Sequence, residues 1–371
     1  MRPWFPLAVA FAAANFSPYL TPLILGAVSD SLDLSPDQAG LLTTLEFAGL
    51  GLASLLVATA VHRLDRRRLT LLGAALAAAG HLFAVIVDSY AVMLPARFAI
   101  GVGEGVLLAA TNATIALSAG AARVYARCIV TTILAASVGY AVCPSAIAAW
   151  GHRGAHGCAA VVLLLALAFI ARRSHPAGAP PRERGTGPAI ARWLLGLTLL
   201  VTLSDGLVWP FAERIGRTLG LEGETLGWML GLSLAAGLLG AGAAERLGTR
   251  FGYLRPLLLG LWGTALAGWG MANAGAPATL FATTVLKNVT ILFFFPYLLG
   301  VAAAVDRSGR TAAAVTGAMP LGVAAGPWLG GLIVETAGFS ALGWGGLGGA
   351  LLATGILLRA RGNLGRGGHG C

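Results

Sequence analysis

Long apolar segments alternate with short polar ones along the whole chain. A helix needs about 20 apolar residues to cross the hydrocarbon core of a bilayer, because only internal hydrogen bonds satisfy its backbone there. Such segments lie at 5–28, 39–61, 69–88, 91–118, 126–149, 156–172, 190–212, 224–245, 255–273, 277–303, 311–335 and 340–359. The pattern predicts an all-α membrane protein with twelve transmembrane helices, arranged as two bundles of six.

The only long polar stretch separates the sixth predicted helix from the seventh. It contains Arg-Arg-Ser-His-Pro and Pro-Pro-Arg-Glu-Arg, a composition typical of linkers. We therefore expect an N-terminal six-helix bundle over 1–172, a cytoplasmic linker over 173–189, and a C-terminal six-helix bundle with a short cytoplasmic tail over 190–371.

The composition supports this class and excludes others. Hydrophobic residues make up 57% of the chain and charged residues 11%, against roughly 25% charged in a soluble domain. The net charge of +10 is typical of nucleic-acid-binding proteins, but the basic residues form short clusters between apolar segments, as cytoplasmic loops do. We therefore expect contacts with membrane lipids and none with nucleic acid.

The basic residues also predict an orientation. About 20 of the 25 lysines and arginines fall on one side of the membrane if both termini are cytoplasmic, and the outer loops hold only Arg153, Arg214 and Arg217. This asymmetry is the strongest sequence indicator of topology. An alanine- and arginine-rich composition with a single lysine favours a bacterial protein, which would lie in the inner membrane.

The two halves of the sequence repeat each other. The basic cluster that begins at Arg63 corresponds to the one that begins at Arg246, and Gly139 with Pro144 corresponds to Gly322 with Pro327. Both correspondences have the same offset of about 183 residues, as expected for a duplicated six-helix unit of the kind found in transporters.

Three motifs follow one another along the chain. Asp65 and Arg66 lie in a basic loop after the second predicted helix, Arg97 precedes Gly-Val-Gly in the fourth, and Gly322–Gly331 carries a Gly-Pro-x-x-Gly-Gly pattern in the eleventh. With the duplication, these motifs resemble the major facilitator superfamily over nearly the whole length. The resemblance implies two pseudo-symmetric bundles in which the first, fourth, seventh and tenth helices line a central cavity. In the fifth helix only Gly139 and Pro144 of the antiporter pattern remain, which argues against a drug–proton antiporter.

Five charged residues lie well inside predicted helices: Glu46, Arg97, Glu104, Asp205 and Lys287. Charges at this depth are costly and usually functional. Four of them fall on the fourth, seventh and tenth helices, which the resemblance places around the cavity. The second helix, which carries Glu46, need not face it, so Glu46 is the weakest candidate.

Glu104 and Lys287 are separated by the repeat offset, so we expect them to face each other as an ion pair, functional or purely structural. A carboxyl group in a low dielectric favours its neutral form, which suits Glu104 and Asp205, with Glu46 behind them, as proton carriers. Arg97 either holds charge beside Glu104, two turns away, or extends to the outer interface.

Polar and aromatic side chains complete the expected substrate site. With Arg97 and Lys287, its predicted members are Asn15, Tyr19, Asn112, Trp209, Asn288 and Tyr297, and Ser17, Thr21 and Phe293 lie among them. For each one alone, helix–helix packing is the alternative. The cationic residues favour an anionic substrate, whereas the carboxylates leave a zwitterionic or cationic one open.

The loop residues Asp65, Arg66 and Arg67, with Arg250, are expected to form an ionic latch on the inner face; their alternative role is to set the topology. We predict a monomeric secondary active transporter that moves a small organic solute by alternating access, driven by protons. An energy-independent facilitator and, less favoured, a non-transporting receptor are the alternatives. The six histidines are scattered and no ATP-binding, metal-ligand or catalytic motif is present, so we expect no enzyme activity, metal or cofactor.

Overall fold

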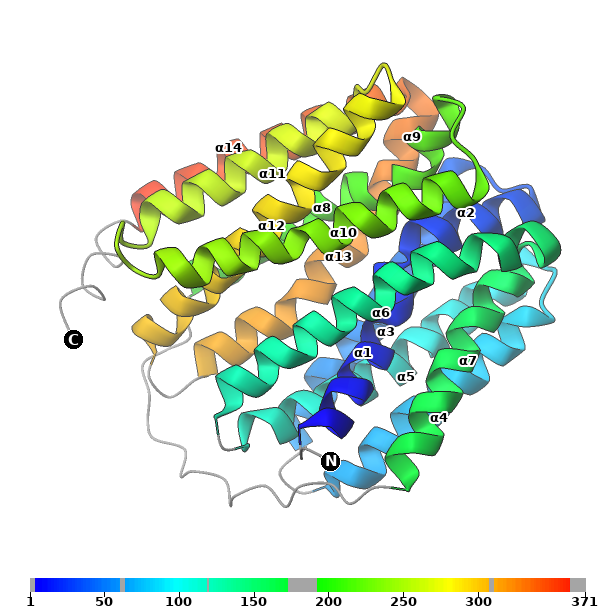
Figure 1. Ribbon diagram of the computed structural model, residues 1–371, viewed down its shortest axis with the longest axis horizontal. Helices are drawn as coiled ribbons and strands as arrows, with labels where there is room; N and C mark the ends of the chain where they lie inside the picture. Colours follow the sequence, from blue (N-terminus) through cyan, green and yellow to red (C-terminus); the bar gives the residue numbers. More distant parts are fainter. Residues whose placement is uncertain (1–3, 61–63, 119, 173–191, 307–309, 361–371) are drawn as a thin grey trace. The chain divides into compact units, whose positions relative to one another are not determined.

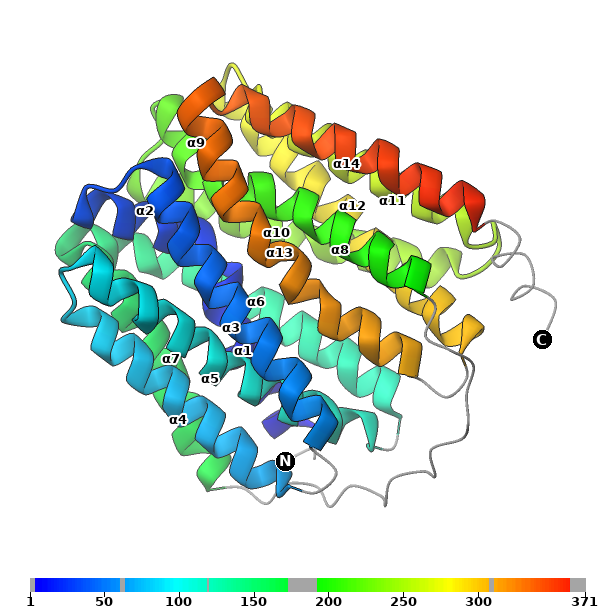
Figure 2. The ribbon, with the colours of Figure 1, turned by 180° about the vertical axis from the view of Figure 1, so that it is seen from behind.

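The computed structural model describes residues 4–60, 64–118, 120–172, 192–306 and 310–360. All regular structure in these ranges is helical, and no strand occurs in them (Figures 1 and 2). The all-α class is therefore confirmed. The predicted linker over 173–189 and the tail from 361 lie outside the described residues, so the division at 172 and 190 stays a prediction.

The chain folds as two compact units, the first formed by 1–182 with 223–231 and the second by 183–222 with 232–371. The helices of the first unit are α1 (Phe5–Tyr19), α2 (Thr21–Leu32), α3 (Pro36–Ala60), α4 (Arg66–Val85), α5 (Tyr90–Ala116), α6 (Ala121–Trp150) and α7 (His152–Ala171). The start of α10 (Gly223–Leu247) also belongs to it.

The second unit contains the rest of α10 and the remaining helices. These are α8 (Arg192–Val208), the short 3-10 helix η1 (Trp209–Phe211), α9 (Ala212–Thr218), α11 (Leu254–Ala272), α12 (Pro277–Val305), α13 (Arg310–Ala337) and α14 (Ser340–Arg359).

Of the described helices, ten are long and apolar enough to cross a membrane, or eleven if the bent pair α1 and α2 is one span. The predicted span over 255–273 forms α11 but is not among them. This helix has 19 residues, and Arg255, Pro256 and several glycines and tryptophans reduce its hydrophobicity. The sequence therefore predicted the helix correctly, whereas its length and composition alone do not qualify it as a span.

Two predicted spans contain breaks caused by proline. The axes of α1 and α2 differ by 47° at Leu20, between Pro18 and Pro22. In the second unit α8 ends at Val208, and Pro210 lies in η1 before the chain continues as α9. Proline lacks a backbone N–H and its ring collides with the preceding turn, so an α-helix bends or ends there.

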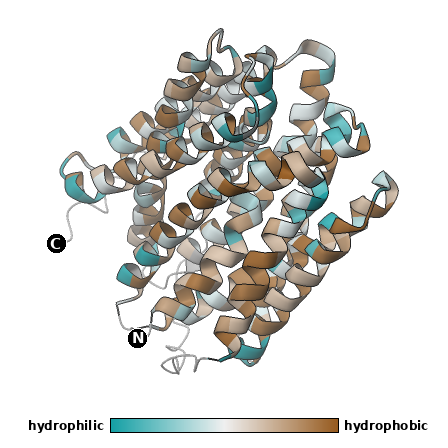
Figure 3. Ribbon diagram, turned by 45° about the vertical axis from the view of Figure 1, so that its right-hand side comes forward, coloured by the Kyte–Doolittle hydropathy of each residue, from teal (hydrophilic) through white to brown (hydrophobic). Residues whose placement is uncertain are grey.

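The outward-facing side chains of the helices are apolar. Leu56, Leu165, Leu239 and Trp344 are each more than 60% exposed, which is unusual for a protein surrounded by water and expected for one surrounded by lipid. Figure 3 shows hydrophobic residues along the helices and hydrophilic ones gathered mainly near their ends. The chain is thus a multi-pass membrane protein.

Candidate functional site

Glycines in α5 allow its backbone to approach two neighbouring helices. A Cβ atom at Gly101 would collide with the carbonyl oxygen of Glu46, and Gly105 also faces α3. Gly103 faces the opposite way, toward Ala77 of α4. Helices in lipid associate through close packing of small residues. As a result α5 lies against both α3 and α4 (Figure 2), and the charged side chains of these helices meet in one buried layer.

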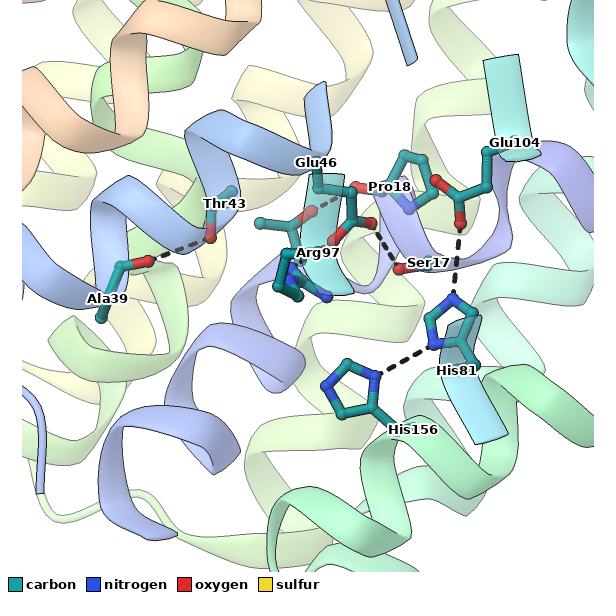
Figure 4. A network of polar contacts seen from close by, with 10 residues as sticks. Ser17, Pro18, Ala39, Thr43, Glu46, His81, Arg97, Glu104 and His156 are labelled. Atoms are coloured by element: carbon teal, nitrogen blue, oxygen red, sulfur yellow. Dashed lines mark hydrogen bonds and ion pairs between the residues drawn. The ribbon is translucent and has the colours of Figure 1, made fainter. Parts of the chain in front are cut away.

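Arg97 of α5 forms an ion pair with Glu46 of α3, between Nη2 and Oε2. The two side chains are only 2% and 1% exposed. Ser17 of α1 donates a hydrogen bond of 2.7 Å to the other carboxylate oxygen of Glu46 (Figure 4). Nε and Nη1 of Arg97 have no hydrogen-bond partner among the described residues. Arg97 is therefore buried rather than extended to the interface, and that alternative is wrong.

Glu104, the second buried carboxylate on these helices, is 0% exposed. Its Oε1 lies 3.6 Å from Nε2 of His81 on α4, which is longer than a hydrogen bond. Nδ1 of His81 in turn lies 3.0 Å from Nδ1 of His156 on α7 (Figure 4). Neither oxygen of Glu104 has a hydrogen-bond partner among the described residues.

The second unit has a charged pair of its own. Nζ of Lys287, on α12, lies 2.7 Å from Oδ1 of Asp205, on α8, and the side chains are 5% and 22% exposed. The ammonium group also lies 4.2 Å from the ring centre of Trp209, within cation–π range. Three sequence-predicted site residues are therefore brought together.

A small cavity of about 30 Å³ adjoins this pair. Its polar lining comes from Ser204 and Thr264 beside Asp205 and Lys287, and its other walls are apolar. A volume of this size accommodates one or two water molecules, and polar neighbours are needed to hold them. The Asp205–Lys287 pair can thus be hydrated inside the unit.

Glu104 and Lys287 each have a charged or titratable neighbour within their own unit. Lys287 is paired with Asp205, and Glu104 lies beside His81. The expected Glu104–Lys287 pair stays a prediction. Glu46, the weakest candidate from the sequence, is the residue that is paired with Arg97.

Two further predicted residues lie on α12. Asn288 donates a hydrogen bond of 3.2 Å to Ser233 of α10. The hydroxyl of Tyr297 is buried without a hydrogen-bond partner among the described residues, and its ring packs on Phe293 at 5.1 Å between centroids. Buried hydroxyl groups are nearly always hydrogen-bonded, so Tyr297 retains an unused donor for a ligand.

The predicted polar residues of the first unit make contacts that fit helix packing. Asn15 donates to the carbonyl oxygen of Phe11, one turn earlier, at 2.8 Å. Asn112 accepts a hydrogen bond of 3.0 Å from Tyr125. The carbonyl oxygen of Tyr19 accepts one of 2.8 Å from Tyr140.

The latch residues lie at helix ends. Asp65 caps α4 by accepting hydrogen bonds from the backbone N–H groups of Arg67 and Arg68, and the Arg67 side chain donates to the carbonyl oxygen of Ala171 at 2.9 Å. Arg66, in the first turn of α4, and Arg250, after α10, complete the set. The latch stays a prediction, and the adjoining residues 61–63 lie outside the described ranges.

Sequence reasoning missed the histidines. His81 and His156 are fully buried and in contact, whereas we had expected the histidines to be scattered. One signal was available: His152 and His156 are four residues apart and therefore share a face of α7. Their contact with α4, however, depends on which helices are neighbours.

Comparisons with known proteins agree with this architecture. The family model described as Major Facilitator Superfamily matches residues 7–195 and 194–366. A D-xylose–proton symporter structure is similar with a TM-score of 0.74 at 16% identity, covering 95% of this chain and 96% of that one. A nucleoside transporter gives 0.73 at 11%, covering 98% and 100%. A peptide transporter in complex with sulfate gives 0.76 at 14%, covering 98% and 95%. At these identities the likeness shows the fold.

Proposed function

The chain belongs to the major facilitator superfamily, and on that premise we propose that it is a secondary active transporter, coupled to protons, of a small organic solute. Transport follows alternating access, in which the binding site opens to one side of the membrane at a time. We further propose that the protein is a monomer in a bacterial inner membrane. Its basic loops favour an orientation with both termini in the cytoplasm. It has no enzyme activity.

The observation that carries the proposal is the charge balance around Arg97. Two fully buried carboxyl groups, those of Glu46 and Glu104, lie in the first unit near a single arginine that is paired with Glu46. A second carboxylate buried without a hydrogen bond or cation is costly, and taking up a proton removes that cost. Glu104 is therefore the proton carrier of this unit.

The unused N–H donors of Arg97 link the protonation of Glu104 to the positions of α3 and α5. When Glu104 holds a proton, Arg97 is ion-paired with Glu46 alone. When Glu104 loses it, the new carboxylate competes for Nε and Nη1 of Arg97, which have no partner among the described residues. Because α3 and α5 are in backbone contact at Gly101, this change of partner shifts the two helices relative to each other.

The second unit supplies the solute contacts. An anionic or zwitterionic solute would compete with Asp205 for Lys287, with Trp209 beside the ammonium group for stacking. The hydroxyl of Tyr297, ten residues farther along α12, offers a separate hydrogen-bond donor. Asp205 released from Lys287 then becomes a second proton acceptor, next to a cavity that water can enter. Solute binding and protonation are thereby coupled at one pair.

A thermal-shift screen across pH identifies the solute. The first probes are xylose, uridine and a dipeptide, the solute classes of the similar structures, followed by small carboxylic acids. The solute that stabilises the protein is then tested in proteoliposomes with a pH gradient. We expect the gradient to drive its accumulation, and Glu104→Gln and Lys287→Ala to abolish it.

Exchange of labelled for unlabelled solute is the control, because it needs binding and alternating access but no net proton movement. Glu104→Gln should retain exchange, whereas Lys287→Ala should weaken it. Accumulation that is unaffected when both substitutions are combined would contradict the proposed site. A gradient that drives no accumulation in the wild type would identify the protein as a facilitator instead.

A further inference from the structure

Three histidines form a row inside the first unit. His81 lies on α4, and His156 and His152 lie one turn apart on α7, which packs against α4. The three residues are 0%, 0% and 3% exposed. Histidine is the side chain whose proton is most readily exchanged near neutral pH, so a buried row of them is a feature that helix packing alone does not require.

His81, at one end of the row, lies beside Glu104, the proposed proton carrier. Nε2 of His81 lies 3.6 Å from Oε1 of Glu104, and its Nδ1 lies 3.0 Å from Nδ1 of His156. The rings of His81 and His156 are 5.2 Å apart between centroids (Figure 4). Nε2 of both histidines and both oxygens of Glu104 have no hydrogen-bond partner in the described part of the chain.

His152, at the other end of the row, contacts the loop between α4 and α5. Nε2 of His152 lies 3.0 Å from the carbonyl oxygen of Val87 and 3.8 Å from Oδ1 of Asp88. Asp88 is 59% exposed and accepts a hydrogen bond of 2.6 Å from Arg153. This hydrogen bond holds the pKa of Asp88 below its ordinary value, so Asp88 is a carboxylate in contact with water.

We propose that His81, His156 and His152 form a proton relay that connects Glu104, buried in the first unit, with Asp88 at the surface. The proposal rests on the proposed function, because it needs Glu104 to take up and release a proton during transport. It adds three residues to that mechanism and assigns the route by which the proton reaches the loop end of the unit.

The proton count closes at every step. A neutral imidazole carries one N–H and has one free nitrogen, so it can accept a proton at one side and release one at the other. For release, Glu104 gives its proton to Nε2 of His81, whose Nδ1–H passes to Nδ1 of His156. The Nε2–H of His156 passes to the free nitrogen of His152, whose Nε2–H passes to Asp88 and then to water.

The observed contacts suit the start of this sequence. A His152 with its proton on Nε2 donates to the carbonyl oxygen of Val87, and one with a free Nδ1 is ready to accept. The rings of His156 and His152 are 6.5 Å apart between centroids, so this step requires a turn of the His152 ring or a bridging water. After release each ring holds the opposite tautomer, which is the set needed for uptake in the reverse direction.

The charged surroundings keep the relay neutral. The ionic groups that act on it are Arg97 and Glu104 on α5, Glu46 on α3, Arg153 at the start of α7 and Asp88 in the loop. The elements packed around it carry others toward their ends, among them Asp30 on α2, Arg66 on α4 and Arg127 on α6. Arg97 is cationic and buried with Glu46, so a second buried cation on His81 or His156 is disfavoured in its field. A proton therefore moves through the rings without remaining on one.

The test uses the full-length protein in lipid nanodiscs and the proton itself as the probe. A rapid rise in pH is applied, and the carbonyl band of protonated Glu104 is followed by infrared spectroscopy, with the band assigned by its loss in Glu104→Gln. His156→Asn keeps a hydrogen-bonding group where Nδ1 lies, but an amide cannot accept a proton on one side and release one on the other as an imidazole does. We expect it to slow deprotonation of Glu104 by at least about tenfold, with the same final protonation.

Two further variants separate the relay from a structural role. His156→Ala removes both the relay and the hydrogen bond, and added imidazole should restore its rate. Cys158→Ser on the same helix is the control and should react at the wild-type rate. If Glu104 deprotonates at the wild-type rate in His156→Asn, the relay is overturned while the proposed function stands. If Glu104→Gln removes no band, the proton role of Glu104 fails, and the relay fails with it.

Discussion

The charged core of the first unit contains more acid than base. Arg97 is 2% exposed and is paired with Glu46, while Glu104, seven residues farther along the same helix, has His81 beside it. The desolvation cost of a buried charge is offset by its ion-pair partner, and removing one partner leaves the other charge uncompensated. The stability of this core therefore depends on which carboxyl group holds a proton.

We expect Glu46→Gln to lower the free energy of unfolding by about 3–5 kcal/mol, because Arg97 loses its ion-pair partner. The loss should be smaller at alkaline than at acidic pH, since Glu104 can release its proton and take the place of Glu46. Thermal unfolding in detergent at several pH values measures this. Glu222→Gln, at an exposed position, is the matched control. A loss that is equal at all pH values would contradict the exchange of partners.

At the level of helices, close backbone contacts determine which side chains meet. Gly101 and Gly103 lie on opposite sides of α5, against α3 and α4 respectively. In the second unit, Gly322 and Gly326 of α13 face α8 in the same way. The motif glycines thus hold the helices that carry Glu46, His81 and Asp205 in register with their neighbours.

A methyl group at Gly101 would collide with the carbonyl oxygen of Glu46. We expect Gly101→Ala to destabilise the protein by about 1–3 kcal/mol, because α3 must move away from α5. It should also weaken proton coupling, since the same movement separates Glu46 from Arg97. Gly157→Ala is the matched control, because nothing lies within 4 Å of the added Cβ. Thermal unfolding compares the two, and equal stabilities would disprove the packing argument.

At the scale of the whole molecule, the orientation in the membrane depends on the charges at the ends of the helices, and the two ends of the first unit differ in charge. The end of the first unit with Asp88 and Arg153 has an ion pair between the loop that follows α4 and the start of α7, and the end with Arg66, Arg67 and Arg68 has a basic cluster at the start of α4. The positive-inside rule predicts that the basic cluster lies in the cytoplasm. The relay would then open to the outer side of the membrane.

This orientation can be measured by labelling single cysteines with a maleimide that does not cross membranes. Arg153→Cys should be labelled in intact cells, and Arg66→Cys only after the membrane is permeabilised. Cys158 and Cys371 are replaced by serine in the background, and the buried Cys128 serves as the unlabelled control. Labelling of Arg66→Cys in intact cells would reverse the orientation.

Much of the fold could be predicted before any coordinates. Apolar length depends on composition alone, so all twelve predicted segments are helical, although the first is divided into α1 and α2 and the seventh ends in the 3-10 helix η1. The break at Leu20 was missed, although Pro18 and Pro22 flank it, because a proline inside an apolar segment does not lower its hydrophobicity enough to divide it.

The buried charged residues were likewise identifiable from the chain, since a charge within an apolar segment is visible without a structure. Their partners were not. Arg97 was expected either beside Glu104 or at the outer interface and is paired with Glu46. Lys287 was expected to face Glu104 and is paired with Asp205. Helical residues rotate by about 100° each, so an uncertainty of a few residues in a boundary hides the direction in which a side chain points.

Hydrophobicity along the chain is a local property, and it was enough to decide the membrane class, the helices and the list of charged residues within them. Contacts between helices that are distant in sequence are not local. The pairing of α4 with α7, which unites His81 and His156, is accompanied by a shared apolar cluster that includes Ala74, Ala78 and Leu163. Only the three-dimensional arrangement turns isolated ionisable residues into a connected set through which a proton can pass.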